Sequence, residues 1–74
     1  MTPSVIHNNL RSLRQAKGLA QYGLAALAGV SPTTIQGAEK WGYLPSHPVR
    51  QRLATALGVR PVDIWPDLDP EVTE

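Results

Sequence analysis

The feature that most limits the fold of this sequence is a corner that occurs twice. Residues 24–32 read LAALAGVSP, and residues 53–61 read LATALGVRP. In each case an apolar helical run ends at a glycine, and a valine and a proline follow at once. Glycine just after a helix and proline at the start of the next one are typical of a tight helical corner. We interpret the repeat as two similar corners rather than a duplication, and it predicts short helices joined by tight turns.

The same pattern of glycines and prolines predicts five helices. The first is expected to begin at Pro3, with Thr2 as its cap, and to stop at Gly18. Its apolar positions at helical spacing are Ile6, Leu10, Leu13 and Ala16. The other four helices are expected at about residues 21–28, 32–40, 48–57 and 61–65. No segment alternates strongly enough to be a strand. The sequence therefore predicts an all-α domain over residues 1–66 and an acidic tail over residues 67–74.

The composition excludes several kinds of site. There is no cysteine, and two histidines alone cannot supply a tetrahedral zinc set. No stretch approaches the roughly 20 apolar residues of a membrane span, and no signal peptide pattern is present. We therefore expect no metal, no cofactor and no membrane association, and a cytoplasmic location.

Charge is divided unevenly along the chain. Residues 1–62 hold all seven cations and one acid, a net charge of +6, whereas the last twelve residues hold five acids and no cation. This division suits a basic body that binds a polyanion, although a solvated basic face is equally common. Five cations are expected to be solvated or to act at long range, with contact to phosphate as the alternative for each: Arg11, Lys17, Arg50, Arg52 and Arg60.

The helix expected at residues 32–40 has an unusual outer side. Ile35 and Ala38 share one face and should point inward. The outward positions are Thr33, Gln36, Gly37 and Lys40. Such a low, nearly uncharged surface fits the DNA major groove, where an amide can pair with adenine and a hydroxyl with a base edge. Gly37 either permits close approach to DNA or packs near a neighbouring backbone.

Glu39 is the only acid in the basic body, and it adjoins the inward face of that helix. A half-buried carboxylate needs a cation, and Arg14 on the first helix is the natural partner for a bidentate pair. The alternatives are a solvated Glu39 and, least favoured, a catalytic one.

Together these residues resemble the lambda repressor and Cro type of helix-turn-helix regulator, the XRE family. The residues that fall in register without gaps are Arg14, Gly18-Leu19, Gln21, Leu24-Ala25, Gly29-Val30-Ser31, Ile35, Glu39, Pro45, Ala54 and Ala56-Leu57-Gly58-Val59. The resemblance covers about residues 6–66 and implies a five-helix bundle whose third helix lies in the major groove. It also implies that Gln21 binds a backbone phosphate and that Arg14 pairs with Glu39. The candidate DNA-binding residues are Gln21, Ser31, Pro32, Thr33, Thr34, Gln36, Gly37, Lys40, Trp41 and Tyr43.

Several positions depart from the family pattern. Ala20 stands where a capping Ser, Thr or Asn is usual. Trp41 occupies the position after the third helix that is normally glycine, and Gly42 follows one residue later. Pro32 and Gly37 replace long polar side chains at reading positions, so affinity is expected to depend on phosphate contacts. Lys40, Trp41 and Tyr43 can make such contacts, although each aromatic can equally pack over the bundle.

The favoured interpretation is a sequence-selective, double-stranded DNA-binding transcription regulator, a repressor that acts on the nucleoid as a homodimer. Trp65, Leu68 and Val72 are candidates for a dimer contact, with core packing the stronger interpretation for Trp65. The alternative function is a protein-interaction module or an antitoxin subunit that retains the fold. An enzyme is disfavoured, because Ser46-His47 sits between prolines with no evident acid partner.

Overall fold

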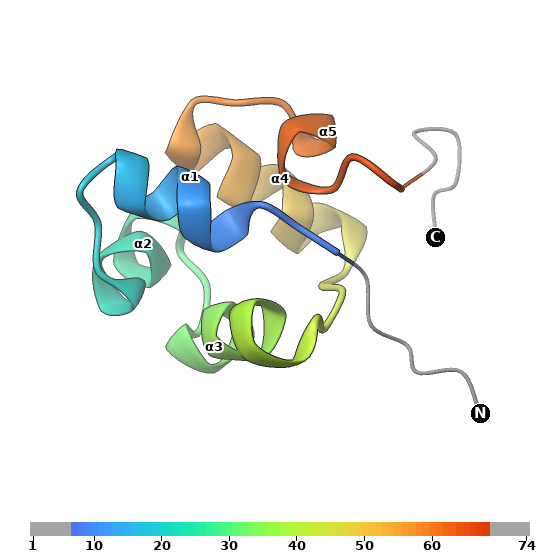
Figure 1. Ribbon diagram of the computed structural model, residues 1–74. Helices are drawn as coiled ribbons and strands as arrows, with labels where there is room; N and C mark the ends of the chain where they lie inside the picture. Colours follow the sequence, from blue (N-terminus) through green and yellow to red (C-terminus); the bar gives the residue numbers. More distant parts are fainter. Residues whose placement is uncertain (1–6, 69–74) are drawn as a thin grey trace.

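The computed structural model describes residues 7–68, which form five helices (Figure 1). These are α1 (Leu10–Ala16), α2 (Gln21–Ala28), α3 (Pro32–Trp41), α4 (His47–Leu57) and α5 (Pro61–Ile64). Within residues 7–68 there is no strand, and no helix is long and apolar enough to cross a membrane. The predicted all-α class is confirmed, and the last four helices begin and end within one residue of their predicted limits.

Helix α1 begins at Leu10, later than the sequence predicted. Residues 7–9 are not helical, and the exposed Ala16 does not face the core. The predicted cap Thr2, the first position Pro3 and Ile6 lie outside the described residues. The part of the prediction that placed a continuous helix through residues 7–9 is therefore wrong.

Two asparagines explain the late start of α1. The side chain of Asn8 accepts a hydrogen bond from the Leu10 amide at 3.0 Å, which closes a local turn. The backbone amide of Asn9 donates to the Ile64 carbonyl at 2.8 Å, and that bond ties the segment to α5. The side-chain bond of Asn8 is of the kind by which asparagine competes with helical hydrogen bonding. The segment before Leu10 is thus held by tertiary bonds instead of helical ones.

The two corners that the sequence repeats have the same geometry in the structure. Gly29 and Gly58 follow α2 and α4 with φ near +70°, a left-handed conformation that side chains other than glycine rarely adopt. The amides of Val30 and Val59 each donate, at 3.0 Å, to the carbonyl five residues earlier. These bonds satisfy carbonyls that the helix end would otherwise leave open.

The core contains side chains from every helix. Its largest fully buried members are Leu10, Leu24, Ile35, Leu53, Ile64, Pro45 and Trp65. Core packing of Trp65, the stronger of its two interpretations, is confirmed. Its indole nitrogen has no hydrogen-bond partner among residues 7–68. Leu68 is partly buried against the same core, whereas Val72 lies outside the described residues.

Arg50 departs from the solvated role expected of it. Its side chain is buried, and Nη1 donates to the Pro45 carbonyl at 2.6 Å. The bond links α4 to the loop that leaves α3, so this arginine supports the fold and is not available at the surface.

Candidate nucleic-acid interface

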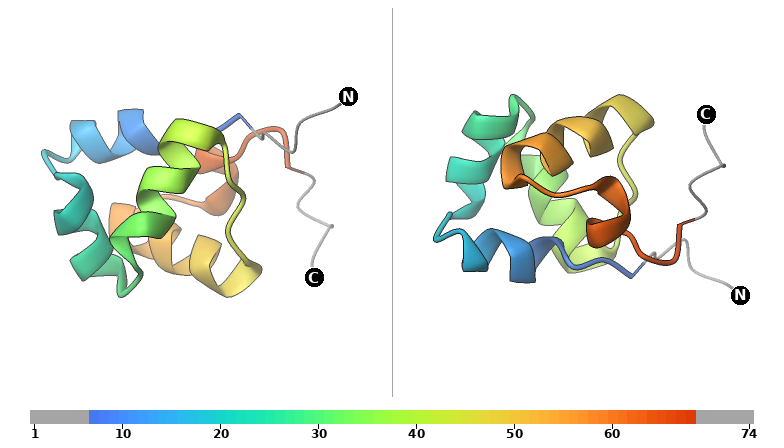
Figure 2. Two further views of the ribbon diagram at one scale, coloured as in Figure 1. Left: turned by 90° about the horizontal axis from the view of Figure 1, so that it is seen from below. Right: turned by 90° about the horizontal axis from the view of Figure 1, so that it is seen from above.

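Helix α3 lies at the edge of the bundle, with one side toward the other helices and the other side away from them (Figures 1 and 2). Ser31 caps it, because Oγ accepts from the Thr33 amide at 3.1 Å, and Pro32 occupies the first turn. Ile35 and Ala38 are buried, as predicted. The cap and the buried side chains therefore fix the position of α3 on the core, and the residues on its outer side face away from the core.

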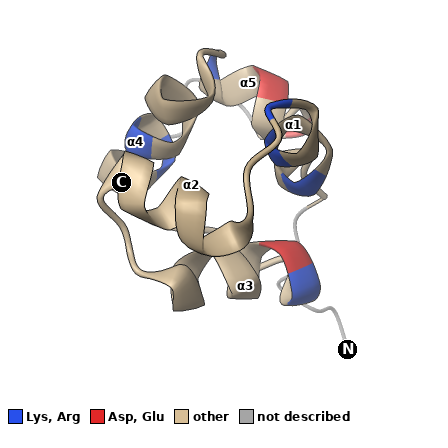
Figure 3. Cartoon of the chain, turned by 90° about the vertical axis from the view of Figure 1, so that its left-hand side faces the viewer, with Lys and Arg blue, Asp and Glu red and all other residues tan. Residues whose placement is uncertain are grey.

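The candidate residues differ in how far they reach solvent. The exposed residues are Ser31, Thr33, Gln36, Lys40, Trp41 and Tyr43, and the half-buried ones are Gln21, Pro32, Thr34 and Gly37. All but Gln21 belong to α3, its cap or the loop that follows it. Figure 3 shows that α2 and most of α3 carry no charged residue, and that the charges of α3 are confined to its last turns. The uncharged part of this surface can thus approach base edges, and the one acid of α3, Glu39, has a buried side chain.

The space beside Gly37 is occupied by a side chain and not by a backbone. A methyl group at this position would meet Tyr43 Cβ at 3.5 Å, which is an ordinary van der Waals distance. The Gly37 carbonyl also accepts the amide of Tyr43 at 3.1 Å. Tyr43 therefore packs against the end of α3, while about half of its surface stays exposed.

The end of α3 is set by Gly42, one residue later than the family pattern implies. Gly42 has φ +71°, so Trp41 is the last helical residue. The Trp41 side chain is exposed, and the ammonium group of Lys40 lies 5.1 Å from the centre of its ring, within the range of a cation–π contact. The last turn of α3 and the loop that follows it therefore offer a cation and two exposed aromatic side chains.

The ion pair predicted between Arg14 and Glu39 is present. Arg14 Nε lies 2.7 Å from Glu39 Oε2, and Nη2 lies 3.0 Å from Oε1. The remaining Nη1 donates to the Leu19 carbonyl at 2.7 Å, in the turn before α2. The side chain of Glu39 is 0% exposed and that of Arg14 is 9% exposed. This pair therefore connects α1, α3 and the turn between α1 and α2 through one buried set of bonds.

Hydrogen bonding outweighs burial in setting the charge of this pair. Burial by itself raises the pKa of Glu39, but the hydrogen bonds from Arg14 and Gln21 hold that pKa below its ordinary value. The hydrogen bond to Glu39 raises the pKa of Arg14 further above its ordinary value. Both groups are charged at neutral pH.

Two further side chains contact Glu39, and neither contact was predicted from the sequence. Gln21, the first residue of α2, donates from Nε2 to Glu39 Oε1 at 3.1 Å. Arg11 Nε lies 3.5 Å from the same oxygen. The spacing of Arg11 and Arg14, one helical turn apart on α1, is the signal that could have predicted a second cation at this carboxylate.

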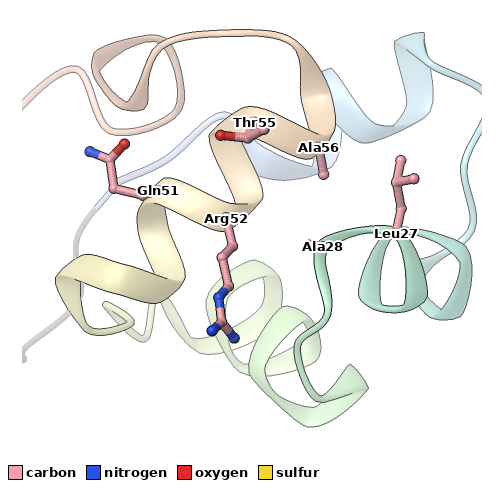
Figure 4. Close-up of a pocket in the computed structure, with 6 residues that line it drawn as sticks. All are labelled: Leu27, Ala28, Gln51, Arg52, Thr55 and Ala56. Atoms are coloured by element: carbon pink, nitrogen blue, oxygen red, sulfur yellow. The ribbon is translucent and has the colours of Figure 1, made fainter.

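A groove with a volume of about 440 Å³ is lined by residues of α2 and α4 (Figure 4). Its lining residues are Leu27, Ala28, Gln51, Arg52, Thr55 and Ala56. Arg52 extends from α4 toward the turn after α2, where Nη1 donates to the Gly29 carbonyl at 3.4 Å (Figure 4). The lining includes no acid, histidine or cysteine, so it does not assemble a general acid–base pair. Within residues 7–68 no cluster of His, Cys, Asp or Glu could hold a metal ion.

Comparison with known proteins places the chain among small regulators. Residues 10–64 match the family described as Helix-turn-helix. One similar solved structure is the crystal structure of the restriction-modification controller protein C.AhdI from Aeromonas hydrophila. Its sequence is 40% identical to this one, the match covers 74% of this chain and 83% of that chain, and the TM-score is 0.69. The hypothetical transcription factor NHTF from Neisseria is 28% identical, covering 85% of this chain and 70% of that one, with a TM-score of 0.71. Among curated proteins none matches.

Proposed function

On the premise that this chain belongs to the XRE-type helix-turn-helix family of DNA-binding transcription regulators, we propose that it selects a duplex sequence by placing α3 in the major groove. The observation that carries the proposal is the division of α3 into an anchored side and an open one. Ile35 and Ala38 fix the helix to the core, and Thr33 and Gln36 point to solvent without a protein cover. A helix held in this way fits a groove about 12 Å wide.

Few side chains are available to read bases. Gln36 can form a bidentate pair with adenine, and Thr33 can offer its hydroxyl or methyl group to a base. Pro32 and Gly37 bring no polar group to the surface. Specificity therefore depends on one or two base pairs in each half-site, and much of the affinity depends on phosphate.

The proposed phosphate contacts lie at the start of α2, at the start of α3 and at the end of α3. Gln21 begins α2, whose cap Ala20 offers no side-chain hydrogen bond, so a phosphate there can accept from open backbone amides. Ser31 and Thr34 lie at the start of α3. Lys40, Trp41 and Tyr43 lie at its end and can bind phosphate and sugar on the other side.

We assign the protein a repressor role and a homodimeric state on DNA in the cytoplasm. One module of this size buries little DNA surface, and two modules on half-sites about 34 Å apart combine their contacts. The similarity to a restriction-modification controller protein supports a regulatory role.

Selection of bound duplexes from a random pool tests this proposal. We expect an enriched site with two symmetric halves, and binding whose log affinity falls with log salt by about 0.9 per phosphate neutralised. Gln36→Ala should cost about 1 to 3 kcal/mol of discrimination at one base pair. Gln51→Ala, an exposed glutamine on α4 beside the groove of Figure 4, is the matched control and should change nothing. No enrichment and no salt-dependent binding would instead indicate a protein-interaction module, such as an antitoxin subunit.

A further inference from the structure

Arg11 and Gln21 come from different helices but meet at one atom. Gln21 Nε2 lies 3.1 Å from Glu39 Oε1, and Arg11 Nε lies 3.5 Å from the same oxygen. The two nitrogens are therefore separated by less than the sum of these distances. Groups this close can reach a single phosphate, or the two phosphates that flank one sugar.

The charge of Glu39 is already balanced without Arg11. Arg14 holds the carboxylate with two short bonds, 2.7 Å and 3.0 Å, and is itself buried. Charge-assisted bonds of about 2.7 to 2.9 Å are the strong ones, whereas an exposed pair at a longer distance contributes little. Arg11 is of the second kind, because its contact is 3.5 Å and its side chain is 64% exposed. The cluster of Arg11, Arg14 and Glu39 thus carries one surplus positive charge, located at the surface.

The side chain of Arg11 has groups free for a ligand. Within residues 7–68 it makes hydrogen bonds only through Nε, so both Nη atoms remain open. Its fork of donors matches the oxygens of a phosphate. Gln21 uses one hydrogen of Nε2 on Glu39, and the amide nitrogen has a second hydrogen to donate.

We infer that Arg11 is a further phosphate-binding residue, and that Arg11 and Gln21 together bind one stretch of DNA backbone at the start of α2. Glu39 is a positioning residue: its buried carboxylate orients both side chains and does not touch DNA. This inference rests on the proposed function and adds α1 to the DNA interface. The competing explanation is that Arg11 only adds a weak ion pair to Glu39 and does not contact DNA.

The test compares Arg11→Gln with Arg60→Gln. Arg60 is a matched control, because it is also an exposed arginine at 3.4 Å from a carboxylate, that of Asp63 on α5. Affinity for a random-sequence duplex is measured over a range of salt concentrations. Arg11→Gln should reduce the salt slope by about 0.9, the loss of one phosphate contact, and Arg60→Gln should leave it unchanged. Equal slopes for wild type and Arg11→Gln would overturn the inference.

Phosphate ethylation locates the contact. On the selected site, ethylation should weaken wild-type binding at the phosphates that Arg11 and Gln21 bind, and Arg11→Gln and Gln21→Ala should lose sensitivity at the same or adjacent phosphates. Loss at phosphates across the groove from those of Gln21 would refute a shared stretch of backbone. Arg11→Lys keeps the charge and should retain the slope, which covers the case in which Arg11→Gln does not fold. Absence of any wild-type binding would refute the proposed function instead, so the two failures are distinguishable.

Discussion

The corners at Gly29 and Gly58 share their geometry but lead to helices of opposite character. After the first corner, α3 runs for ten residues and exposes a low, nearly uncharged side. After the second, α5 has four residues, and Ile64 and Trp65 are buried at its end. The turn geometry therefore depends on the glycine and the valine, whereas the role of each helix depends on the residues that follow the proline.

Each of the two helices also carries one acid, and these acids are held differently. Glu39 is buried and bound by an arginine from another helix. Asp63 accepts the Arg60 amide at 2.9 Å, which is a local bond at the start of its own helix. The first acid fixes a helix to the bundle, and the second only closes a turn.

The largest expected effect is on the buried pair. Arg14→Ala leaves the Glu39 carboxylate buried without its main partner, so we expect the free energy of unfolding to fall by about 3 to 5 kcal/mol. Arg60→Ala removes an exposed partner from Asp63 and should leave the unfolding curve almost unchanged. Urea denaturation of both variants measures the difference. A small change in Arg14→Ala would mean that Gln21 and Arg11 are sufficient partners for Glu39.

Acid should weaken the same pair by a smaller amount. Because the folded state holds the pKa of Glu39 below its ordinary value of 4.5, its contribution to stability is complete above that pH and is lost as the pH falls through the folded pKa. A protonated Glu39 can still accept from Gln21, so the loss is smaller than that from Arg14→Ala. We expect the stability of Glu39→Gln to depend less steeply on pH below 4.5 than that of the wild type. The same dependence in both proteins would assign the acid transition to other carboxylates, such as Asp63.

The two glycines provide a direct test of whether the corners are equivalent. Gly29→Ala and Gly58→Ala each force a left-handed conformation on alanine, which costs roughly 1 to 2 kcal/mol. A methyl group meets nothing within 4 Å at Gly29 and only the flexible end of Lys17 at Gly58. Thermal melting should therefore give similar losses for both. A much larger loss at either glycine would show that the corner has a role beyond its turn.

The corners, the inward positions of α3 and the pair of Arg14 with Glu39 could be predicted because each follows from local periodicity or from a simple charge balance. The start of α1 could not, because the Asn9 amide bonds a carbonyl of α5 that is distant in the sequence. The burial of Arg50 depends on the path of a loop with no regular pattern. The meeting of Arg11 and Gln21 at one oxygen requires three helices to be placed together. Sequence patterns thus predict the faces of helices, and tertiary packing decides which polar groups meet.

The smallest expected effect concerns Gly37, which has no counterpart in α5. Gly37→Ala removes the cost of a glycine inside a helix, about 1 kcal/mol, and the new methyl group meets Tyr43 at an ordinary contact distance. The variant should therefore unfold at a slightly higher urea concentration than the wild type. If Gly37 faces the base edges, the same methyl group should reduce DNA affinity even though the protein is more stable.

Opposite changes in stability and affinity are the signature of a position kept small for its ligand. Thr55→Ala, on the exposed side of α4, is a control for a substitution to alanine that is remote from α3, and it should leave DNA affinity unchanged. If Gly37→Ala raises stability and binds DNA as the wild type does, Gly37 serves only the packing of Tyr43. The low surface that distinguishes α3 from α5 would then depend on Thr33 and Gln36 alone.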